Sequence, residues 1–180
     1  MTLRSSRQPK SIDLPARQTD SLPHVSIIIP VYNGADVVGP LLDSIQRLDY
    51  PVGRYEVLVV DNNSSDGLEQ VVAAYPVRLL HERGVQSSYA ARNLGIRQAR
   101  GEILAFTDAD CRVDPQWLRC LQAPFKDPTV GGAAGSIRGI EPAKSWVEEA
   151  LNRRHHVSSI RRCPPDGSGP KLKRSFEKQK

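Results

Sequence analysis

Four apolar runs, separated by segments with helical periodicity, constrain the fold of this chain more than any other feature. The first run, V-S-I-I-I-P-V at residues 25–31, is continuous and rich in β-branched side chains, which is typical of a strand buried on both faces. Comparable runs occupy residues 55–61, 77–82 and 102–108. Strands that alternate with helices of about ten residues form βαβ units. The sequence therefore predicts an α/β fold with three layers, α/β/α, around a mostly parallel central sheet.

Capping residues indicate where the intervening helices begin and end. We expect Asp66 to cap the helix after the second run, and Ser87 or Ser88 to cap the helix after the third. Gly101 stands where that helix should stop. Asp114, followed by proline, predicts the start of a further helix. A glycine-rich strand or loop is expected at residues 131–139, and an apolar helical face at residues 146–151.

Composition divides the chain into three parts. Residues 1–24 lack periodicity, and we expect a flexible leader. Residues 25–151 carry the strand and helix pattern and should form one domain. Residues 152–180 form a basic tail, expected to be partly disordered, with nine Lys and Arg against two acidic residues. This tail has a net charge of +7, so a total of +5 leaves −2 for the remainder, and we expect no nucleic-acid partner.

The lack of a visible signal peptide or membrane span, together with the cysteine usage, favours a cytoplasmic location. No apolar run approaches the roughly 18 residues of a membrane span, and no apolar segment follows the basic N-terminus as in a signal peptide. Three cysteines without a C-x-x-C pair argue against a disulfide framework or a zinc ribbon. The basic tail leaves peripheral contact with the inner face of a membrane as a further expectation.

Asp108 and Asp110 stand one residue apart directly after the fourth apolar run. Two neighbouring carboxylates repel unless positive charge lies beside them. At the carboxyl end of a parallel strand, where such sheets bind ligands, they could hold Mg²⁺ or Mn²⁺ together with substrate phosphates. The alternative is a solvated turn.

Two further residues are candidates for binding a nucleotide at the same edge of the sheet. Asp61 ends the second strand and could accept hydrogen bonds from a ribose or a base, or simply bond its own turn. Arg92 lies early in a predicted helix and could pair with a diphosphate or a base carbonyl, or remain a surface arginine.

Several other site classes are disfavoured. The chain has neither G-x-G-x-x-G after the first strand nor G-x-x-x-x-G-K-[ST], which argues against dinucleotide dehydrogenases and P-loop NTPases. His155 and His156 are adjacent, and neighbouring residues of a helix point about 100° apart, so we expect a solvated pair rather than a metal site.

Taken together, these motifs resemble those of family 2 glycosyltransferases with the A-type nucleotide-sugar-binding fold. The matching segments are V-S-I-I-I-P-V-Y-N-G, Y-E-V-L-V-V-D-N-N-S-S-D-G, A-A-R-N-L-G-I, A-R-G-E-I-L-A-F-T-D-A-D-C and G-G-A-A-G-S-I-R-G. They occur in the family's order over roughly residues 25–150. The resemblance implies transfer of a sugar, with inversion, from a nucleoside diphosphate sugar that is usually uridine-linked in similar proteins.

The resemblance also assigns roles to individual residues. It implies that Pro30 and Tyr32 line the nucleobase pocket, and that Asp61 holds the base or ribose. Arg92 would lie beside the base and diphosphate. Asp108 and Asp110 match the D-x-D that holds Mn²⁺ or Mg²⁺, with Asp110 as the direct ligand and Asp108 also counted in the donor site.

The acceptor side departs from the family pattern. Members usually carry a Glu-Asp pair or a single Asp base well downstream, whereas here Glu148-Glu149 and Asp166 are the acidic residues nearest to that role. We therefore expect a shortened chain whose catalytic base is unknown and whose acceptor is an unidentified glycan, lipid or small molecule. The alternatives are a non-catalytic donor-binding remnant, a metal-dependent phosphohydrolase, and a protein that interacts through its basic tail.

Overall fold

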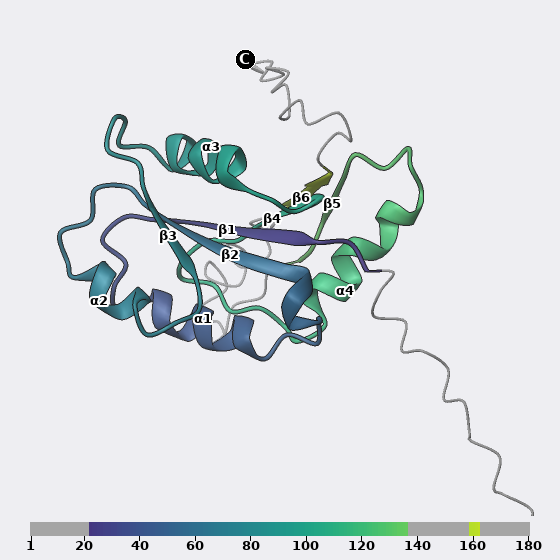
Figure 1. The fold of residues 1–180 in the computed structure, drawn as a ribbon, viewed down its shortest axis with the longest axis horizontal. Helices are drawn as coiled ribbons and strands as arrows, with labels where there is room; N and C mark the ends of the chain where they lie inside the picture. Colours follow the sequence, from purple (N-terminus) through teal and green to yellow (C-terminus); the bar gives the residue numbers. More distant parts are fainter. Residues whose placement is uncertain (1–21, 137–158, 163–180) are drawn as a thin grey trace, which may run out of the picture.

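The computed structural model describes residues 22–136 and 159–162, and these form a six-stranded sheet in the order β3-β2-β1-β4-β6-β5 (Figure 1). The strands are β1 (Val25–Val31), β2 (Tyr55–Asp61), β3 (Arg78–His81), β4 (Ile103–Phe106), β5 (Gly132–Ala134) and β6 (Ser159–Arg162). β1 pairs in parallel with β2 and β4, and β2 pairs in parallel with β3. β6 is antiparallel to both β4 and β5. The predicted α/β class with a mostly parallel sheet is confirmed.

Helices cover both faces of the sheet (Figure 1). The helices are α1 (Val38–Gln46), α2 (Leu68–Val72), α3 (Ser88–Gln98) and α4 (Trp117–Gln122), with short 3₁₀ segments η1 (Val52–Arg54) and η2 (Ala123–Lys126). One core packs alternate side chains of β1, β2 and β4 against α1, α2 and α4, and the other packs the intervening side chains against α3. The continuous apolar runs therefore serve two cores at once, because successive side chains of a strand point to opposite faces.

Small residues let α3 lie close to the sheet. Ala91 is fully buried, and a Cβ placed on Gly95 would lie 2.5 Å from Cγ2 of Ile28 and 3.3 Å from Cγ2 of Val60. The small residues of the A-A-R-N-L-G motif thus serve helix–sheet packing, and the close packing fixes the position of the other side chains of α3.

The structure confirms one of the expected helix caps and corrects others. Ser87 caps α3, since its side chain accepts the N–H of Tyr89. Asp66 does not cap α2, which begins after Gly67. The carboxylate of Asp66 instead accepts the N–H of Ala35 at 2.8 Å. Gly101 is required for close packing rather than as a helix stop, because a Cβ there would lie 2.5 Å from the backbone nitrogen of Ser26. Asp114 does not start α4 either, since α4 begins at Trp117 after Gln116, and the Asp114 carboxylate accepts the N–H of Gln116 at 2.8 Å in the preceding turn.

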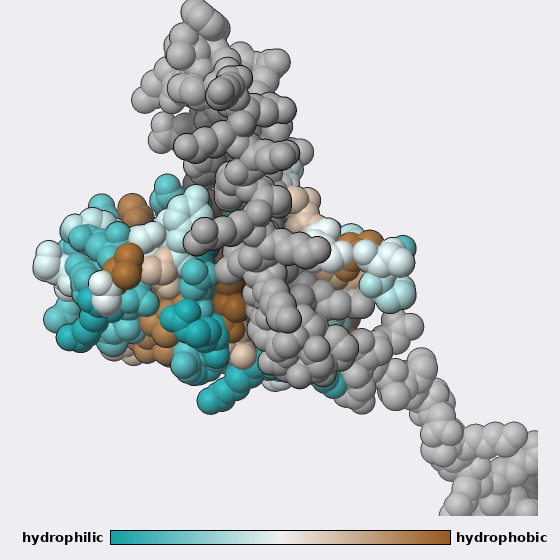
Figure 2. Space-filling view, turned by 90° about the horizontal axis from the view of Figure 1, so that it is seen from above, coloured by the Kyte–Doolittle hydropathy of each residue, from teal (hydrophilic) through white to brown (hydrophobic). Residues whose placement is uncertain are grey.

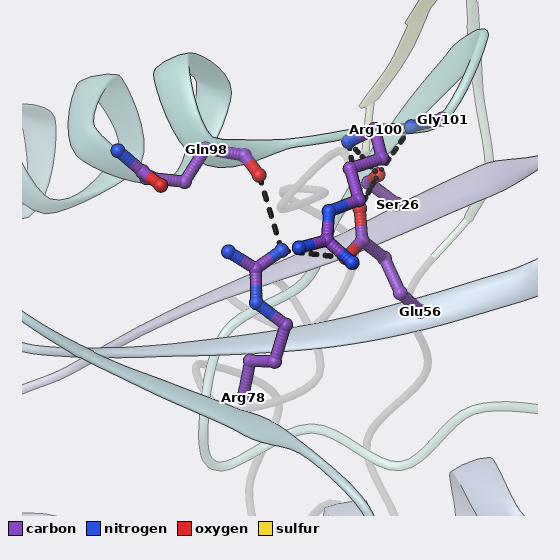
Figure 3. Close-up of polar contacts among 6 residues, drawn as sticks. All are labelled: Ser26, Glu56, Arg78, Gln98, Arg100 and Gly101. Carbon is purple, nitrogen blue, oxygen red and sulfur yellow. Dashed lines mark hydrogen bonds and ion pairs between the residues drawn. The ribbon is translucent and has the colours of Figure 1, made fainter.

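A polar network holds the amino end of the sheet, opposite the ends where the parallel strands finish (Figure 3). Oε1 of Glu56 accepts hydrogen bonds from the hydroxyl of Ser26 and the N–H of Arg100, each at 2.7 Å, and Oε2 accepts from Nη1 of Arg78 at 2.8 Å. Nη1 of Arg78 also lies 3.2 Å from the carbonyl of Gln98. Burial raises the pKa of Glu56, but these hydrogen bonds outweigh burial and the pKa is lowered. The network ties the turn between α3 and β4 to the sheet.

The described residues begin before the predicted domain and reach into the predicted tail. The carbonyl of Pro23 accepts the hydroxyl of Tyr50 at 2.7 Å, so the end of the expected leader contacts the domain. β6 falls within residues 152–180, where no strand was expected. The apolar face at 146–151, Glu148-Glu149, His155-His156 and Asp166 lie outside the described residues. No helix in the described part is long and apolar enough to span a membrane.

Candidate functional site

The candidate site lies at the carboxyl edge, by which we mean the edge of the sheet where β1, β2, β3 and β4 end (left in Figure 1). The loops after β1 and β4 touch there, since a Cβ placed on Gly34 would lie 3.9 Å from Cβ of Ala109. The loops after β1 and β2 meet as well, because the N–H of Asn62 donates to the carbonyl of Val31 at 2.8 Å. The parallel topology thus gathers the loops that follow β1, β2 and β4 in one place.

Side chains join the loops after β1 and β2 into one rim. The N–H of Asn33 donates to Oγ of Ser64 at 3.0 Å, and Oδ1 of Asn33 accepts the N–H of Ser65 at 2.9 Å. The bond from Ala35 to Asp66 closes the same rim. Asn33 has a φ of 46°, in the left-handed region that asparagine tolerates better than most residues. The rim is therefore held in place before any ligand arrives.

Pro30 and Tyr32 flank the last residue of β1. Pro30 is half-buried and stands opposite Val60 in the parallel register. Tyr32 is 55% exposed and belongs to the few large hydrophobic side chains exposed among the described residues. Figure 2 shows hydrophobic residues set among hydrophilic ones on one face of the molecule. An exposed ring beside a fixed rim is available to stack on a planar ligand.

Asp61 is a buried carboxylate at the end of β2, with 7% of its surface exposed. Its Oδ1 accepts the N–H of Ser64 at 2.8 Å, and its Oδ2 lies 3.2 Å from Nδ1 of His81. Burial raises the pKa of Asp61, but the hydrogen bonds from Ser64 and His81 outweigh burial and the pKa is lowered. Asp61 is therefore ionised at neutral pH, and its remaining lone pairs can accept an N–H or O–H from a ligand.

Arg92 reaches from α3 to the D-x-D segment. Its Nη2 lies 2.6 Å from Oδ1 of Asp108, and the two side chains are 30% and 42% exposed. The guanidinium supplies positive charge beside Asp108, one of the two neighbouring carboxylates. Arg92 is therefore a paired, half-buried residue of the site rather than an isolated surface arginine.

The D-x-D segment fits a hard divalent cation by the chemistry of its donors. Asp110 is exposed and Asp108 partly so, and both offer carboxylate oxygens. Within residues 22–136 and 159–162, no group of three or more His, Cys, Asp and Glu side chains is placed to hold a metal ion. Mg²⁺ needs no such group, because it commonly takes one or two carboxylates and completes its shell with water and substrate phosphates. Burial raises the pKa of the Cys111 thiol, which disfavours it as a metal ligand at neutral pH.

Sequence reasoning missed His81 and left Asn62 without a role. His81 ends β3 and pairs in register with Asp61, so its position was visible as a polar residue next to the end of the third apolar run. Asn62 is buried, and its Nδ2 donates to the carbonyls of Glu82 and Val85 at 3.3 and 2.9 Å. It thereby ties the loop that leads into α3 to the end of β2.

Comparison with known protein families identifies the chain. The model of "Glycosyl transferase family 2" matches residues 26–171. This chain belongs to glycosyl transferase family 2. It is a glycosyltransferase family 2 domain by sequence, and the carboxyl-edge site described above lies within the matched region.

Curated members of glycosyl transferase family 2 resemble the chain over part of their length. Glycosyltransferase AglE of Haloferax volcanii is 47% identical over 129 residues, which cover 69% of this chain and 42% of that protein. Beta-monoglucosyldiacylglycerol synthase of Synechocystis is 31% identical over 137 residues, covering 72% of this chain and 27% of that protein. The chain thus spans less than half the length of these relatives.

Two solved structures of similar fold contain a bound nucleotide sugar. A mannosyltransferase from Pyrobaculum calidifontis, in complex with GDP-Man and Mn²⁺, has a TM-score of 0.56 and 32% identity, over 65% of this chain and 36% of that one. Residues 1–349 of Staphylococcus aureus TarS, in complex with UDP-GlcNAc, have a TM-score of 0.54 and 26% identity, over 67% of this chain and 37% of that one. Both of these neighbours hold a nucleotide sugar, and one holds Mn²⁺.

Proposed function

We propose that this family 2 chain is an inverting glycosyltransferase that transfers a sugar from a nucleoside diphosphate sugar to an acceptor hydroxyl. For the donor we propose a uridine diphosphate sugar. The observation that carries the proposal is the contact between Arg92 and Asp108 at the carboxyl edge, on the same edge as the ionised Asp61. A guanidinium suits a diphosphate, carboxylates suit the cation bound to it, and an ionised carboxylate can accept the N–H or O–H groups of a nucleoside.

The donor's nucleoside end would lie at the ends of β1 and β2. Asp61 accepts a hydrogen bond from the base or ribose, while Pro30 and the exposed ring of Tyr32 line the base. Because Ser64 and His81 already hold the Asp61 carboxylate, it does not have to be ordered when the nucleoside binds. Preorganisation of this kind lowers the entropic cost of binding.

The diphosphate would lie between α3 and the D-x-D segment. Arg92 pairs with a phosphate oxygen, and Asp108 and Asp110 are the residues that would hold Mn²⁺ or Mg²⁺. When bound, such a cation acts as a Lewis acid that stabilises the charge on the departing nucleoside diphosphate. Arg92 adds a fixed positive charge on the same side.

Inversion requires the acceptor hydroxyl to attack from the face opposite the leaving diphosphate, with its proton taken by a carboxylate. We assign no residue to that base; if the chain transfers sugar, Glu148 and Glu149, which lie outside the described residues, are the first to test. For the acceptor we propose only a hydroxyl of a glycan, lipid or small molecule. We place the reaction in the cytoplasm, at the inner face of the membrane when the basic tail contacts anionic lipid.

Calorimetry of the purified chain with UDP and GDP, in MnCl₂ and in EDTA, tests the proposal. We expect one nucleotide to bind in MnCl₂ and to lose at least roughly tenfold in affinity in EDTA, since a cation bridging carboxylate and phosphate is removed. Asp110→Asn should reproduce that loss in MnCl₂. Asp114→Asn is the matched control, because Asp114 faces the turn before α4 and asparagine retains the acceptor oxygen.

Two outcomes would contradict the proposal. Equal nucleotide affinity in MnCl₂ and in EDTA would show that no cation takes part in binding. Failure to bind either nucleotide under both conditions would show that the chain does not bind the proposed class of donor.

A further inference from the structure

His81 holds a defined place between two carboxylates. It is the last residue of β3, and its Nδ1 lies 3.2 Å from Oδ2 of Asp61. Its Nε2 lies 3.7 Å from Oε1 of Glu69, beyond hydrogen-bonding distance, and Glu69 is 64% exposed at its side chain. The short contact of His81 is therefore the one to Asp61.

The protonation of Asp61 determines which atom of His81 donates. The lowered pKa of Asp61 keeps the carboxylate ionised, and an ionised carboxylate can only accept hydrogen bonds. Nδ1 of His81 therefore carries a proton and donates it to Oδ2. Since the Ser64 N–H holds Oδ1, one partner fixes each oxygen of the carboxylate.

A carboxylate fixed at both oxygens keeps unused lone pairs, because each oxygen accepts about two hydrogen bonds. Without His81, only Ser64 would hold the carboxylate, and Oδ2 would lose its donor within a buried environment. The side chain could then turn about its Cβ–Cγ bond, and binding of a nucleoside would have to restrict that motion.

We propose that His81 is a positioning residue for the donor nucleoside: its Nδ1–H fixes the Asp61 carboxylate in the orientation that accepts the nucleoside's N–H or O–H group. The inference rests on the proposed function and adds to it a residue that touches no substrate. It also separates the two ends of the donor, because His81 acts through Asp61, whereas Arg92 and Asp108 serve the diphosphate.

Substitutions that move the donor atom test this role. In asparagine, Nδ2 is as many bonds from Cα as Nδ1 of histidine, so His81→Asn retains the donor to Asp61. In glutamine, Nε2 is as many bonds from Cα as Nε2 of histidine, so His81→Gln places the donor on the Glu69 side instead. His81→Leu has no donor. Glu69→Gln is the control for the longer contact.

Affinities for UDP, GDP and inorganic pyrophosphate, measured in MnCl₂ by calorimetry, are the readout, with a melting curve for each variant. We expect His81→Gln and His81→Leu to weaken nucleotide binding by about tenfold, the scale of one hydrogen bond. His81→Asn should stay within roughly threefold of wild type. Pyrophosphate affinity should be the same in all variants, and Glu69→Gln should bind as wild type does.

The possible failures are distinguishable. Unchanged nucleotide binding in His81→Leu, or a loss in His81→Asn as large as in His81→Leu, overturns the positioning role while the proposed function stands. An equal loss for pyrophosphate also overturns it, because the effect would then be general to the site. If His81→Leu does not fold, the comparison of His81→Asn with His81→Gln decides. A wild-type chain that binds pyrophosphate but no nucleotide refutes the proposed function first.

Discussion

Replacing Arg92 by glutamine should change cation and nucleotide binding in opposite directions. Nη2 of Arg92 lies 2.6 Å from Oδ1 of Asp108, one of the oxygens proposed to bind the cation. A cation that binds alone must share Asp108 with the guanidinium or displace it. A nucleoside diphosphate, by contrast, gains a partner when Arg92 turns to its phosphates. Arg92→Gln therefore removes a competitor of the cation for Asp108 and also removes a partner of the nucleotide's phosphates.

The exposure of the pair limits the first effect, the gain in Mn²⁺ affinity. The side chains are 30% and 42% exposed, so solvent screens the ion pair, and such pairs are worth about 0.2–1 kcal/mol. Arg92→Gln should thus strengthen binding of Mn²⁺ alone by at most about fivefold. A hydrogen bond from a guanidinium to a diphosphate is worth about 1.5–3 kcal/mol, so nucleotide affinity should fall by roughly 10- to 150-fold.

Titration of the chain with Mn²⁺, followed by electron paramagnetic resonance of the free ion, measures the first effect. Calorimetry with UDP and GDP in saturating Mn²⁺ measures the second. Arg97→Gln is the matched control, since it removes the same charge from the exposed last turn of α3. Raising the salt concentration should shrink the gain in Mn²⁺ affinity, because exposed charges are screened. The reasoning is refuted if Arg92→Gln binds Mn²⁺ no more tightly than wild type and binds nucleotide equally well.

Two further predictions concern the packing that supports the site. Glu56→Gln should lower the free energy of unfolding by about 1.5 kcal/mol at neutral pH, because it breaks the charged hydrogen bond from Arg78 in a partly buried network. The pKa of Glu56 is lowered from its ordinary 4.5, so its contribution is present above that value and is lost as the pH falls through the folded-state pKa. Urea unfolding from pH 7 to pH 3 should therefore show the difference between variant and wild type shrinking in acid, with the exposed Glu102→Gln as control, whereas a constant difference would contradict the role of the charge. Gly95→Ala should destabilise the fold by about 1–3 kcal/mol despite alanine's better helix propensity, because its Cβ would meet fully buried Ile28 at 2.5 Å. Gly53→Ala, with no neighbour within 4 Å, should change the urea midpoint little, and equal midpoints for both alanine variants would contradict the close packing of α3.

Periodicity in the sequence was enough to predict the fold class, since the alternating strands and helices follow from local patterns. It also placed Asp61 and the D-x-D segment at strand ends, because parallel strands connected by helices must finish at one edge. β6 was missed because four residues in a basic segment form a strand only when β4 and β5 supply partners. The domain boundaries at residues 24 and 151, and the roles of the site residues, stay predictions.

The tertiary structure decided which of these side chains meet. Arg92 and Asp108 lie 16 residues apart, and their contact depends on Gly95 and Ala91 letting α3 pack tightly on the sheet. Asp61 and His81 lie 20 residues apart and are joined by the register of β2 and β3. Local sequence specifies where an element ends, because capping and periodicity act over a few residues. Register and helix–sheet distance come from packing between segments remote in the chain, and at this edge they determine which charges become partners.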